Sequence, residues 1–477
     1  MAVNHFDLIV IGSGPAGERG AAHAAQMGKK VAIIERDSGF GGTVASLGTL
    51  PSKTLREVAS HLAGFRQRGI HGVNLTMQDH LGTQDLLYRE RLVRQLEQAR
   101  IRSVFEQGRI TVYHGSAVFV DATAVRIRSP GGLGEEELLS AQKILIATGS
   151  SPCRAELFRV DHPEVYDSET ILRMQNIPKS MAVVGGGVIA VEYASIFAAL
   201  GVQLTLVEEG DRLLTFLDRD VSSALLASLR SSGVDVRLSD SATSLRQGPP
   251  LGLTLRSGAS LQVDTVLVCT GRTGNSTDLG LQTAGINTGD RGFIPVGPNG
   301  ETSVEGIYAA GDIVGFPALA SAAREQAVRA VTHAFGGGLV TQPSHPVLYG
   351  IYTIPECSMA GESEEGLNKR GVPWISGIAH YPGNTKGQII GARVGFVKLL
   401  FHRQSMKLLG VHIIGEQASE LVHIGLVALQ TGAGAQLFVD TPFNYPTLGD
   451  LYKAATFDAL AKNAPQKSVS SLLRPKT

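Results

Sequence analysis

A short apolar run leads directly into a Gly-rich turn near the start of the sequence. Residues 6–11 read Phe-Asp-Leu-Ile-Val-Ile, and residues 12–17 read Gly-Ser-Gly-Pro-Ala-Gly. An Ala-rich stretch of helical character follows, and a second apolar run at residues 31–34 ends in Glu35. This order predicts a strand, a tight turn, a helix, a second strand and a carboxylate at its end.

The same layout returns later in the chain. Apolar residues 181–184 lead into a second Gly-rich turn at residues 185–190, and after a helical stretch the apolar run 204–207 ends in Glu208. The two copies are offset by 173 residues at every key position, and each acid lies 18 residues beyond the last small residue of its turn. The chain therefore contains an internal repeat.

Each position of this pattern has a role in binding a dinucleotide. The first Gly allows the tight turn, the second lets the backbone approach a pyrophosphate, and a small third residue lets the helix pack on the strand. The helix N-terminus offers free N–H groups to the phosphates, and the acid accepts hydrogen bonds from a ribose diol. Two dinucleotide sites in one chain are the direct interpretation, and purely structural turns are the alternative.

The composition narrows the class of protein. Gly supplies 57 of the 477 residues, and 43 basic residues balance 43 acidic ones, which argues against a broad basic surface for nucleic acid or an anionic membrane. Three Cys without a Cys-x-x-Cys pair cannot form a disulfide framework. No apolar run reaches the ~18 residues of a membrane span, and no His cluster has metal-ligand spacing. We expect a multidomain cytoplasmic protein with no nucleic-acid, membrane or metal partner.

Further strand signals place the second copy inside a larger domain. Residues 141–150 read as a strand that ends in a polar turn, and residues 265–272 are its counterpart after the second copy. Another strand-and-turn signal at residues 306–312 precedes an Ala-rich helical stretch to about Phe335. Beyond a polar junction at residues 341–346, strand-like runs and one long helical stretch predict a separate α+β domain.

These residues resemble the two-dinucleotide-binding flavoproteins, the pyridine nucleotide-disulfide oxidoreductase family that includes lipoamide dehydrogenase, glutathione reductase and mercuric reductase. The resemblance covers nearly the whole chain and rests on six motifs: Gly12-Ser13-Gly14-Pro15-Ala16-Gly17, Gly41-Gly42-Thr43, Gly48-Thr49-Leu50-Pro51-Ser52-Lys53, Ala147-Thr148-Gly149-Ser150, Gly271-Arg272 and Ala309-Ala310-Gly311-Asp312-Ile313. It implies an α/β fold with two Rossmann-like domains, the NAD(P) domain inserted in the FAD domain, and a C-terminal α+β dimerisation domain. The implied boundaries are 1–150 and 276–344 for the FAD domain, 151–275 for the NAD(P) domain, 345–462 for the dimerisation domain and 463–477 for a mobile tail.

The resemblance also implies a bound FAD in the first copy and a nicotinamide nucleotide in the second. By family position Glu35 binds the adenosine ribose of FAD, and Asp312 binds its ribityl or phosphate side. Lys53 lies near the flavin N5 and favours the reduced flavin, and Glu192 resembles the family acid near the nicotinamide carboxamide. A solvated helix residue is the alternative for Lys53, and an ordinary turn-forming residue is the alternative for Asp312.

The cofactor-binding positions that the resemblance assigns come from both copies and from the later motifs. They are Gly12, Gly14, Pro15, Ala16, Gly17, Glu35, Arg36, Gly42, Thr43, Val44, Thr49, Lys53, Ala147, Thr148, Gly149, Gly185, Gly187, Val188, Ile189, Glu208, Gly271, Arg272, Gly311, Asp312, Leu319 and Ala320.

Two departures from the family pattern remove its thiol chemistry. Disulfide reductases carry a pair of Cys at the positions of Val44 and Thr49, and neither of these side chains can form a thiolate. Tyr445 stands where the family has a His base, with Asp450 at the place of the supporting acid. A phenol with a pKa near ~10 is a poor base at neutral pH. We therefore expect no reduction of disulfides, lipoamide or mercuric ion.

One branch of the family lacks the thiol pair, the soluble pyridine nucleotide transhydrogenases, and the chain resembles this branch in detail. The matching stretches are Gly48 to Lys53, Glu192 to Phe197, Asp211 to Leu214, Gly271 to Asn275, Gly350 to Glu356 and Phe443 to Thr447. The branch usually keeps one Cys at the position of Val44 and often has a neutral residue at that of Glu208, so the chain departs from it twice.

The implied function is FAD-dependent transfer of hydride between NAD(H) and NADP(H). A reduced nicotinamide delivers hydride to the flavin N5 and leaves, and an oxidised acceptor then enters the same site, a ping-pong mechanism without disulfide chemistry. We assign Lys53, Glu192 and Tyr445 to the catalytic site. By family analogy Tyr445 comes from the other subunit of a homodimer or higher homo-oligomer and shields the flavin, with interface packing as the alternative.

The residues that choose between NAD and NADP give a mixed signal. Glu208 favours NAD, because a carboxylate binds a 2′-OH and repels a 2′-phosphate. Ala190, at the third position of its turn, is more common in this family with NADP users. Arg212 lies four residues beyond Glu208 and could reach a phosphate, although Glu209 and Asp211 flank it. We expect NAD to bind well and NADP less well than in typical transhydrogenases.

Two other functions stay open. An NADH oxidase or diaphorase with a quinone, dye or oxygen acceptor fits Glu208, because weak NADP binding would hinder one half of a transhydrogenase cycle. A non-catalytic flavoprotein that binds partners or reports redox state fits the loss of both thiols, although the intact Gly-rich turns and Lys53 argue against it.

Overall fold

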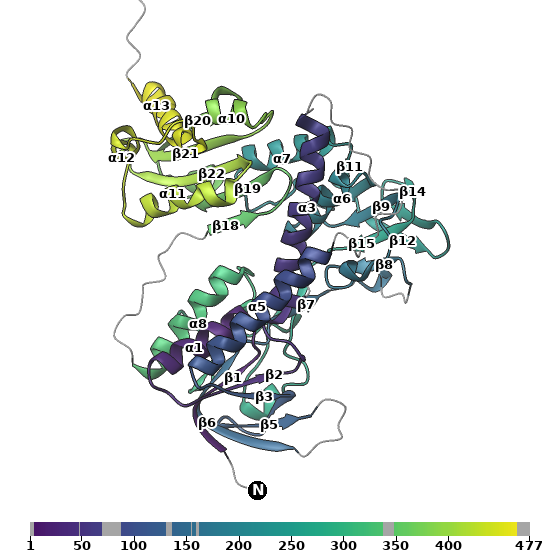
Figure 1. Ribbon diagram of the computed structural model, residues 1–477, viewed down its shortest axis with the longest axis vertical. Coiled ribbons are helices and arrows are strands. Elements are labelled where there is room, and N and C mark those ends of the chain that lie inside the picture. Colours follow the sequence, from purple (N-terminus) through teal and green to yellow (C-terminus); the bar gives the residue numbers. More distant parts are fainter. Residues whose placement is uncertain are drawn as a thin grey trace, which may run out of the picture. The chain divides into compact units, whose positions relative to one another are not determined.

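The computed structural model describes residues 4–46, 48–68, 87–129, 136–153, 155–158, 162–336 and 348–464. It divides into two compact units, each of which is described by itself (Figure 1). The first unit comprises residues 1–209 and 237–344, and the second comprises residues 210–236 and 345–477. The predicted junction at 341–346 and residues 465–477 of the predicted tail lie outside the described residues. The domain boundaries stay predictions.

A seven-stranded sheet forms the centre of the first unit. Strand β1 (Asn4–Ile11) lies between β2 (Val31–Glu35) and β6 (Glu137–Ile146) and runs parallel to both. The strand order is β3-β2-β1-β6-β5-β4, and β17 also pairs with β6. These other strands are β3 (Thr111–His114), β4 (Ser116–Phe119), β5 (Ala124–Arg128) and β17 (Ile307–Ala309).

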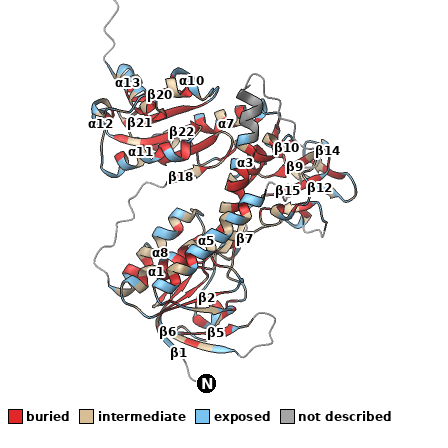
Figure 2. Ribbon diagram, in the orientation of Figure 1, coloured by how far each residue is buried: buried red, intermediate tan, exposed pale blue. Residues whose placement is uncertain are grey.

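Side chains alternate along β1 between two hydrophobic cores. Leu8 and Val10 pack in one core with the helices α1 and α8, whereas Ile9 and Ile11 pack in the core on the opposite face. The second half of the strand, from Leu8 to Ile11, is therefore buried on both faces, which explains its continuous apolar sequence (Figure 2). The helices of this unit around the sheet are α1 (Pro15–Gln26), α2 (Gly42–Ser46), α3 (Thr49–Arg68), α5 (Tyr88–Gln107) and α8 (Ala320–Phe335).

The second copy of the repeat forms a parallel sheet of its own. Strand β9 (Ser180–Val184) leads through the Gly-rich turn into α6 (Val188–Ala199) and then β10 (Gln203–Val207), which pairs with β9 in parallel. The predicted repeat is confirmed. Strands β10, β9, β15 and β8 follow one another across this sheet, and β12, β13 and β14 form a separate three-stranded sheet. The strands not yet bounded are β8 (Val165–Asp167), β11 (Asp235–Arg237), β12 (Ala242–Arg246), β13 (Leu251–Leu255), β14 (Ser260–Val263) and β15 (Thr265–Val268).

Two short strands join the repeat copies. Strand β7 (Ser150–Pro152) follows β6, and β16 (Arg272–Gly274) follows β15, and the two pair with each other antiparallel. The segments that lead into and out of the second copy therefore run side by side.

The second unit is built on a five-stranded sheet in the order β18-β19-β22-β21-β20, antiparallel at every pair. Its core combines the inner faces of these strands with helices α11 and α13. The predicted α/β fold with a C-terminal α+β part is confirmed. The strands are β18 (Leu348–Ile351), β19 (Glu356–Gly361), β20 (Trp374–His380), β21 (Phe396–His402) and β22 (Leu408–Gly415), and the helices are α7 (Arg219–Ser231), α9 (Glu364–Lys369), α10 (Thr385–Ile389), α11 (Ala418–Gln430), α12 (Ala435–Asp440) and α13 (Leu451–Asn463).

A group of charges around the buried Lys398 fixes α7 to the sheet of the second unit. Lys398 on β21 is 1% exposed, and its Nζ lies 2.9 Å from Asp218 Oδ1, 2.7 Å from Asp220 Oδ2 and 2.7 Å from Glu364 Oε1. Asp218 is itself buried and caps α7 by accepting a hydrogen bond from the N–H of Asp220. Burial disfavours the charge on Lys398, but hydrogen bonds to Asp220 and Glu364 outweigh it and raise its pKa to about 12.

The change Lys398→Met should destabilise the second unit by about 3–5 kcal/mol, because it leaves the buried Asp218 carboxylate without a counterion. The control Asp220→Asn alters the exposed member of the group and should cost no more than about 1 kcal/mol. Thermal unfolding followed by circular dichroism measures both. Equal stability of the Lys398 variant and the wild type at pH 8 would contradict the prediction.

The stability difference should also depend on pH in one direction. The folded-state pKa of Lys398 is raised above its ordinary value of 10.5, so its contribution is fully present below pH 10.5 and is lost as the pH rises through about 12. The wild type and the Lys398 variant should therefore converge in stability across that range.

Candidate functional site

A pocket of about 410 Å³ lies in the first unit, where the parallel strands β1, β6 and β17 end. Gly12 follows β1, Ala147 follows β6 and Ala310 follows β17, and all three line the pocket. This volume is typical of a ligand site, and the carboxyl edge of a parallel sheet is where such folds bind ligands.

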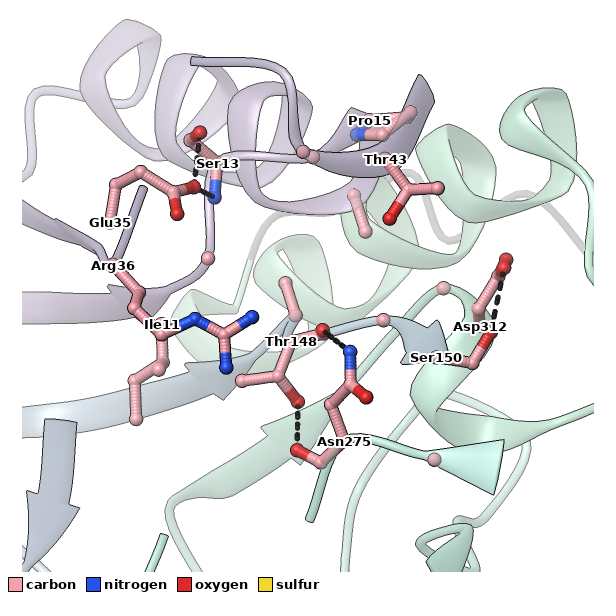
Figure 3. A pocket seen from close by; sticks show the side chains of 18 of the residues that line it. Ile11, Ser13, Pro15, Glu35, Arg36, Thr43, Thr148, Ser150, Asn275 and Asp312 are labelled. Atoms are coloured by element: carbon pink, nitrogen blue, oxygen red, sulfur yellow. Dashed lines mark hydrogen bonds between the residues drawn. The ribbon is translucent and has the colours of Figure 1, made fainter. Parts of the chain in front are cut away.

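Most of the predicted cofactor residues meet at this pocket, although they come from segments far apart in the chain (Figure 3). Those that line it are Gly12, Gly14, Pro15, Ala16, Glu35, Arg36, Gly42, Thr43, Val44, Thr49, Ala147, Thr148, Gly149, Gly311, Asp312 and Ala320. Gly17, Lys53 and Leu319 are not part of the lining. A Cβ on Gly17 would overlap the carbonyl of Gly12, so this glycine serves the packing of α1 on the turn. Leu319 is the N-cap residue of α8.

Gly12 and Gly14, both in the first turn, differ in backbone conformation and in the space around them. Gly12 has a φ of +101°, and a Cβ there would overlap the carbonyl oxygen of Ala147. Gly14 has an ordinary φ of −62°, and a Cβ there would meet no atom of the chain within 4 Å. The fold itself therefore requires Gly12, whereas the space beside Gly14 is open for a ligand to approach the backbone.

The second turn repeats this geometry. Gly185 has a φ of +120°, and a Cβ there would overlap the carbonyl oxygen of Cys269, whereas a Cβ on Gly187 would meet nothing within 4 Å. The strand ends are also fixed in the same way, since Gly12 N–H donates to Ile34 O and Gly185 N–H donates to Val207 O, both at 2.8 Å. The two turns have the same architecture.

Both helices begin without a side-chain cap. Gly14 is the N-cap of α1, with Pro15 at the start of the helix, and Gly187 is the N-cap of α6, where Val188 and Ile189 form the first turn. Neither glycine has a side chain to accept a hydrogen bond from the first N–H groups, so these donors and the helix dipole favour an anionic ligand. The arrangement fits a pyrophosphate at each turn.

Glu35 is held at the pocket by a hydrogen-bond network (Figure 3). Its Oε2 accepts hydrogen bonds from Ser13 N–H at 2.9 Å and from Ser13 Oγ–H at 2.5 Å, and its Oε1 accepts from Asp37 N–H at 2.9 Å. Gly41 N–H in turn donates to Ser13 Oγ at 3.1 Å. Ser13 was not among the predicted site residues. The sequence signal that could have identified it is its hydroxyl, which lies inside the turn that Glu35 faces.

In the second copy, Glu208 at the end of β10 turns toward the equivalent position. A Cβ on Gly186 would lie 2.6 Å from Glu208 Cγ and 2.7 Å from its Oε2, so the side chain lies over the turn. Both predicted ribose-binding acids therefore face the middle residue of their own Gly-rich turn.

Several further residues line the pocket that were not among the predicted cofactor-binding positions. Asn275 joins two segments, because its Nδ2–H donates to Thr148 O and its carbonyl accepts from Thr148 Oγ1–H, both at 2.9 Å (Figure 3). Its sequence signal is its place at the end of the matching stretch from Gly271 to Asn275. The other unpredicted lining residues are Ile11, Ser13, Ile34, Asp37, Gly115, Ser116, Ala117, Ser150, Thr273, Gly274, Thr277, Asp278, Leu279, Ala310, Ala318 and Ala323.

Lys53 and Glu192, two predicted catalytic residues, form an ion pair within the first unit. Lys53 Nζ on α3 lies 2.6 Å from Glu192 Oε2 on α6, and the Glu192 side chain is only 5% exposed. Helix α3 follows the first copy of the repeat, α6 belongs to the second copy, and the two helices pack on each other. Tyr445, the third predicted catalytic residue, belongs to the second unit, where it is 71% exposed and its hydroxyl lies 2.9 Å from Thr385 Oγ1. Its placement beside a partner's flavin stays a prediction.

The two positions that would carry the thiols lie at the pocket. Val44 on α2 and Thr49 at the start of α3 both line it. The three cysteines, Cys153, Cys269 and Cys357, are not part of its lining, and each is a free thiol. Burial raises the pKa of Cys357 to about 12 and raises that of Cys269 as well. Neither of these two thiols is a thiolate at neutral pH.

The family model of the pyridine nucleotide-disulphide oxidoreductases matches residues 6–327, and the model of that family's dimerisation domain matches residues 347–456. The chain belongs to this family. Family membership implies FAD and NAD(P)(H) as cofactors, and the dimerisation domain indicates a homo-oligomer.

Two relatives with the same name match over nearly the full length. A soluble pyridine nucleotide transhydrogenase of Mycobacterium bovis strain BCG Pasteur is 39% identical over 96% of this chain and 98% of its own length. The protein of the same name from Pseudomonas savastanoi pv. phaseolicola is 39% identical over 96% of this chain and 99% of its own.

Two solved structures share the fold. LpdA from Mycobacterium tuberculosis superimposes with a TM-score of 0.86 at 26% identity, covering 95% of this chain and 99% of its own. The HOCl-induced flavoprotein disulfide reductase RclA from Escherichia coli gives a TM-score of 0.84 at 23% identity, over 94% and 99% of the two chains, and this likeness concerns the fold alone.

Two features are absent from the part of the chain that the structure describes. No helix there is long and apolar enough to cross a membrane. In the same residues, no three His, Cys, Asp or Glu side chains are grouped so as to hold a metal ion.

Substitutions of the open glycines should separate cofactor binding from folding. Gly14→Ala should leave the fold stable but lower the affinity for FAD at least tenfold, because its methyl group occupies the space through which the pyrophosphate approaches. Gly187→Ala should keep the flavin and raise the KM for nicotinamide nucleotides instead. Flavin absorbance per protein and steady-state kinetics measure the two effects.

The matched control is Gly12→Ala. This variant should lose stability of the fold, because its backbone conformation is strained, whereas Gly14→Ala should lose affinity for FAD. A left-handed backbone costs a residue with a Cβ about 1–2 kcal/mol, and the overlap with Ala147 adds to this. Its melting temperature should fall below that of Gly14→Ala in the absence of added cofactor. Equal flavin content in the Gly14 variant and the wild type would refute the assignment.

Proposed function

We propose that the protein is a FAD-dependent transhydrogenase that transfers hydride between NAD(H) and NADP(H) without a disulfide intermediate. The observation that carries the proposal is the combination of two dinucleotide-type turns with Val44 and Thr49 at the places of the family's redox thiols. Two relatives named soluble pyridine nucleotide transhydrogenase, 39% identical over 96% of the chain, support it.

The residues at the first turn fit FAD. The space beside the Gly14 backbone is open, and the uncapped start of α1 offers N–H donors to the pyrophosphate. Glu35, held by Ser13, would accept hydrogen bonds from the adenosine ribose. Bound FAD would supply a centre that can accept and return a hydride, so that one nicotinamide would be oxidised and another reduced in turn at the same site, which is a ping-pong cycle.

The protein's own side chains supply geometry and charge. The Glu192 carboxylate lies 2.6 Å from Lys53 Nζ and so holds this cation in one orientation. By family position we expect the cation to lie near the flavin N5. A fixed cation stabilises the negative charge that develops on reduction without having to reorganise. Tyr445 from a partner subunit would exclude water from the same site, and a phenol suffices there because no dithiol needs a base.

The choice of nucleotide follows from Glu208. Its carboxylate lies over Gly186 at the second turn, where it accepts hydrogen bonds from a ribose 2′-OH and repels a 2′-phosphate. We therefore expect a lower KM for NADH than for NADPH, and a tighter value for NADPH would overturn this part of the proposal.

The first test is an anaerobic titration of the flavin-containing protein with NADPH and then with thio-NAD. The flavin absorbance should bleach with NADPH and recover with thio-NAD, because hydride passes from one nicotinamide to the other. Initial rates at several fixed acceptor concentrations should give parallel double-reciprocal lines. The same titration with NADH measures the preference for NAD.

Other outcomes identify the competing functions. Bleaching by NADH alone, with recovery only on addition of oxygen or a quinone, indicates a diaphorase or oxidase. A flavin that neither nicotinamide reduces indicates a non-catalytic flavoprotein.

A variant without cysteine should keep the activity. Replacing Cys153 by Ser and both Cys269 and Cys357 by Ala should change the transhydrogenase rate less than about threefold, because no thiol takes part. The variant Lys53→Met keeps all three thiols but removes the fixed cation. Its transhydrogenase rate should fall at least about tenfold, because removal of a single group that stabilises developing charge has effects of this size or larger. Loss of turnover in the cysteine-free variant with the flavin still bound would show that a thiol is needed.

A further inference from the structure

The two connecting strands of the first unit bring a buried serine to the edge of the pocket. Ser150 is the first residue of β7, it is 3% exposed, and it lines the pocket beside Asp312. Strand β16 pairs with β7 and begins with Arg272, whose partner in register is Pro152. Arg272 was predicted to bind cofactor, yet it is not part of the pocket lining.

Arg272 instead donates two hydrogen bonds to Ser150. Its Nε–H donates to Ser150 Oγ at 2.7 Å, and its Nη2–H donates to the backbone carbonyl of the same residue. A guanidinium presents these donors in a fixed fork, so the two bonds together set the orientation of Ser150.

These two hydrogen bonds determine the direction of the hydrogen bond between Ser150 and Asp312. A guanidinium can only donate, so Ser150 Oγ must act as acceptor toward Arg272. Its single proton is then directed to Asp312 Oδ2, 3.2 Å away, as Figure 3 shows for the Ser150–Asp312 pair. At the pocket wall the Asp312 carboxylate therefore accepts a hydrogen bond from a hydroxyl whose orientation is fixed by Arg272.

A carboxylate from the inserted segment lies at the other end of this chain of contacts. Glu169 Oε1 lies 3.6 Å from Arg272 Nη2, and both side chains are mostly buried. Burial raises the pKa of Glu169, and the charge of Arg272 opposes that rise. The contacts therefore run from Glu169 through Arg272 and Ser150 to Asp312.

We propose that Arg272 and Ser150 are positioning residues that hold the Asp312 carboxylate in the orientation that binds FAD, with Glu169 as the counterion of Arg272. This role rests on the proposal that the pocket takes FAD. It assigns to the connecting strands a part in cofactor retention in addition to joining the two repeat copies.

The substitution Ser150→Ala isolates this role. It removes the hydroxyl but keeps the backbone carbonyl that Arg272 also binds and the pairing of β7 with β16. Holoenzyme diluted into buffer should release FAD about tenfold faster, as expected for a lost hydrogen bond to a charged group. Recovery of free-flavin fluorescence measures the rate, and the KM for NADH should stay within twofold.

Three matched variants separate positioning from general support of the fold. Ser150→Thr keeps a hydroxyl and should restore slow release. In an Asp312→Asn background, Ser150→Ala should add less than twofold, because its effect acts through that carboxylate. Ser151→Ala removes a neighbouring hydroxyl of the same strand, which contacts Asn275 Oδ1 at 2.8 Å and not Asp312, and it should leave release unchanged.

The results distinguish this proposal from that of the function. Release unchanged in Ser150→Ala, or an equal increase in Ser151→Ala, would overturn the positioning role. A wild-type protein that holds FAD but does not exchange hydride would overturn the transhydrogenase proposal and leave the release measurement intact. A wild-type protein that takes up no FAD would overturn both.

Discussion

At the end of β1 the backbone passes so close to the carbonyl of Ala147 that no side chain fits on Gly12. This close approach fixes the turn, because Gly12 N–H bonds to Ile34 O on one side while Ala147 N–H bonds to Ile11 O on the other, both at 2.8 Å. The direction of α1, the open space beside Gly14 and the line of approach to the helix N-terminus all follow from it. The second copy obeys the same constraint at Gly185, which is why two sites of equal geometry occur in one chain.

The chemistry is set by what surrounds these turns. Val44 and Thr49 take the places from which the family's thiols relay electrons, yet the ion pair of Lys53 with Glu192 is intact at 2.6 Å. A site that keeps its charge arrangement but lacks the relay is suited to direct hydride exchange between nucleotides. Loss of the thiols alone would equally fit decay of function, but a buried acid paired so closely with a lysine favours a working site.

The sequence predicted what depends on local pattern. The repeat, the turns and about half of the pocket lining could be read from it, because tight turns require particular residues at fixed spacing. Contacts between distant segments left no such signal. Lys398 meets Asp218 across 180 residues, and a lone lysine in an apolar strand gives no indication of its partner. The pocket wall from Gly115 to Ala117 contributes by position and not by side-chain type, so no motif marks it.

The two turns differ at several positions, and the difference between Ser13 and Gly186 bears on how firmly each ligand is held. In the first turn Ser13 bonds the ribose-binding acid through both its N–H and its hydroxyl, so the Glu35 carboxylate is held before a ligand arrives. In the second, the equivalent residue is Gly186, so the serine hydroxyl of the first turn has no counterpart there. Because a preorganised group loses less entropy on binding, the Ser13 contacts favour retention of the nucleotide at the first site. The proposed ping-pong cycle requires such retention, since the flavin must remain bound while one nicotinamide replaces another.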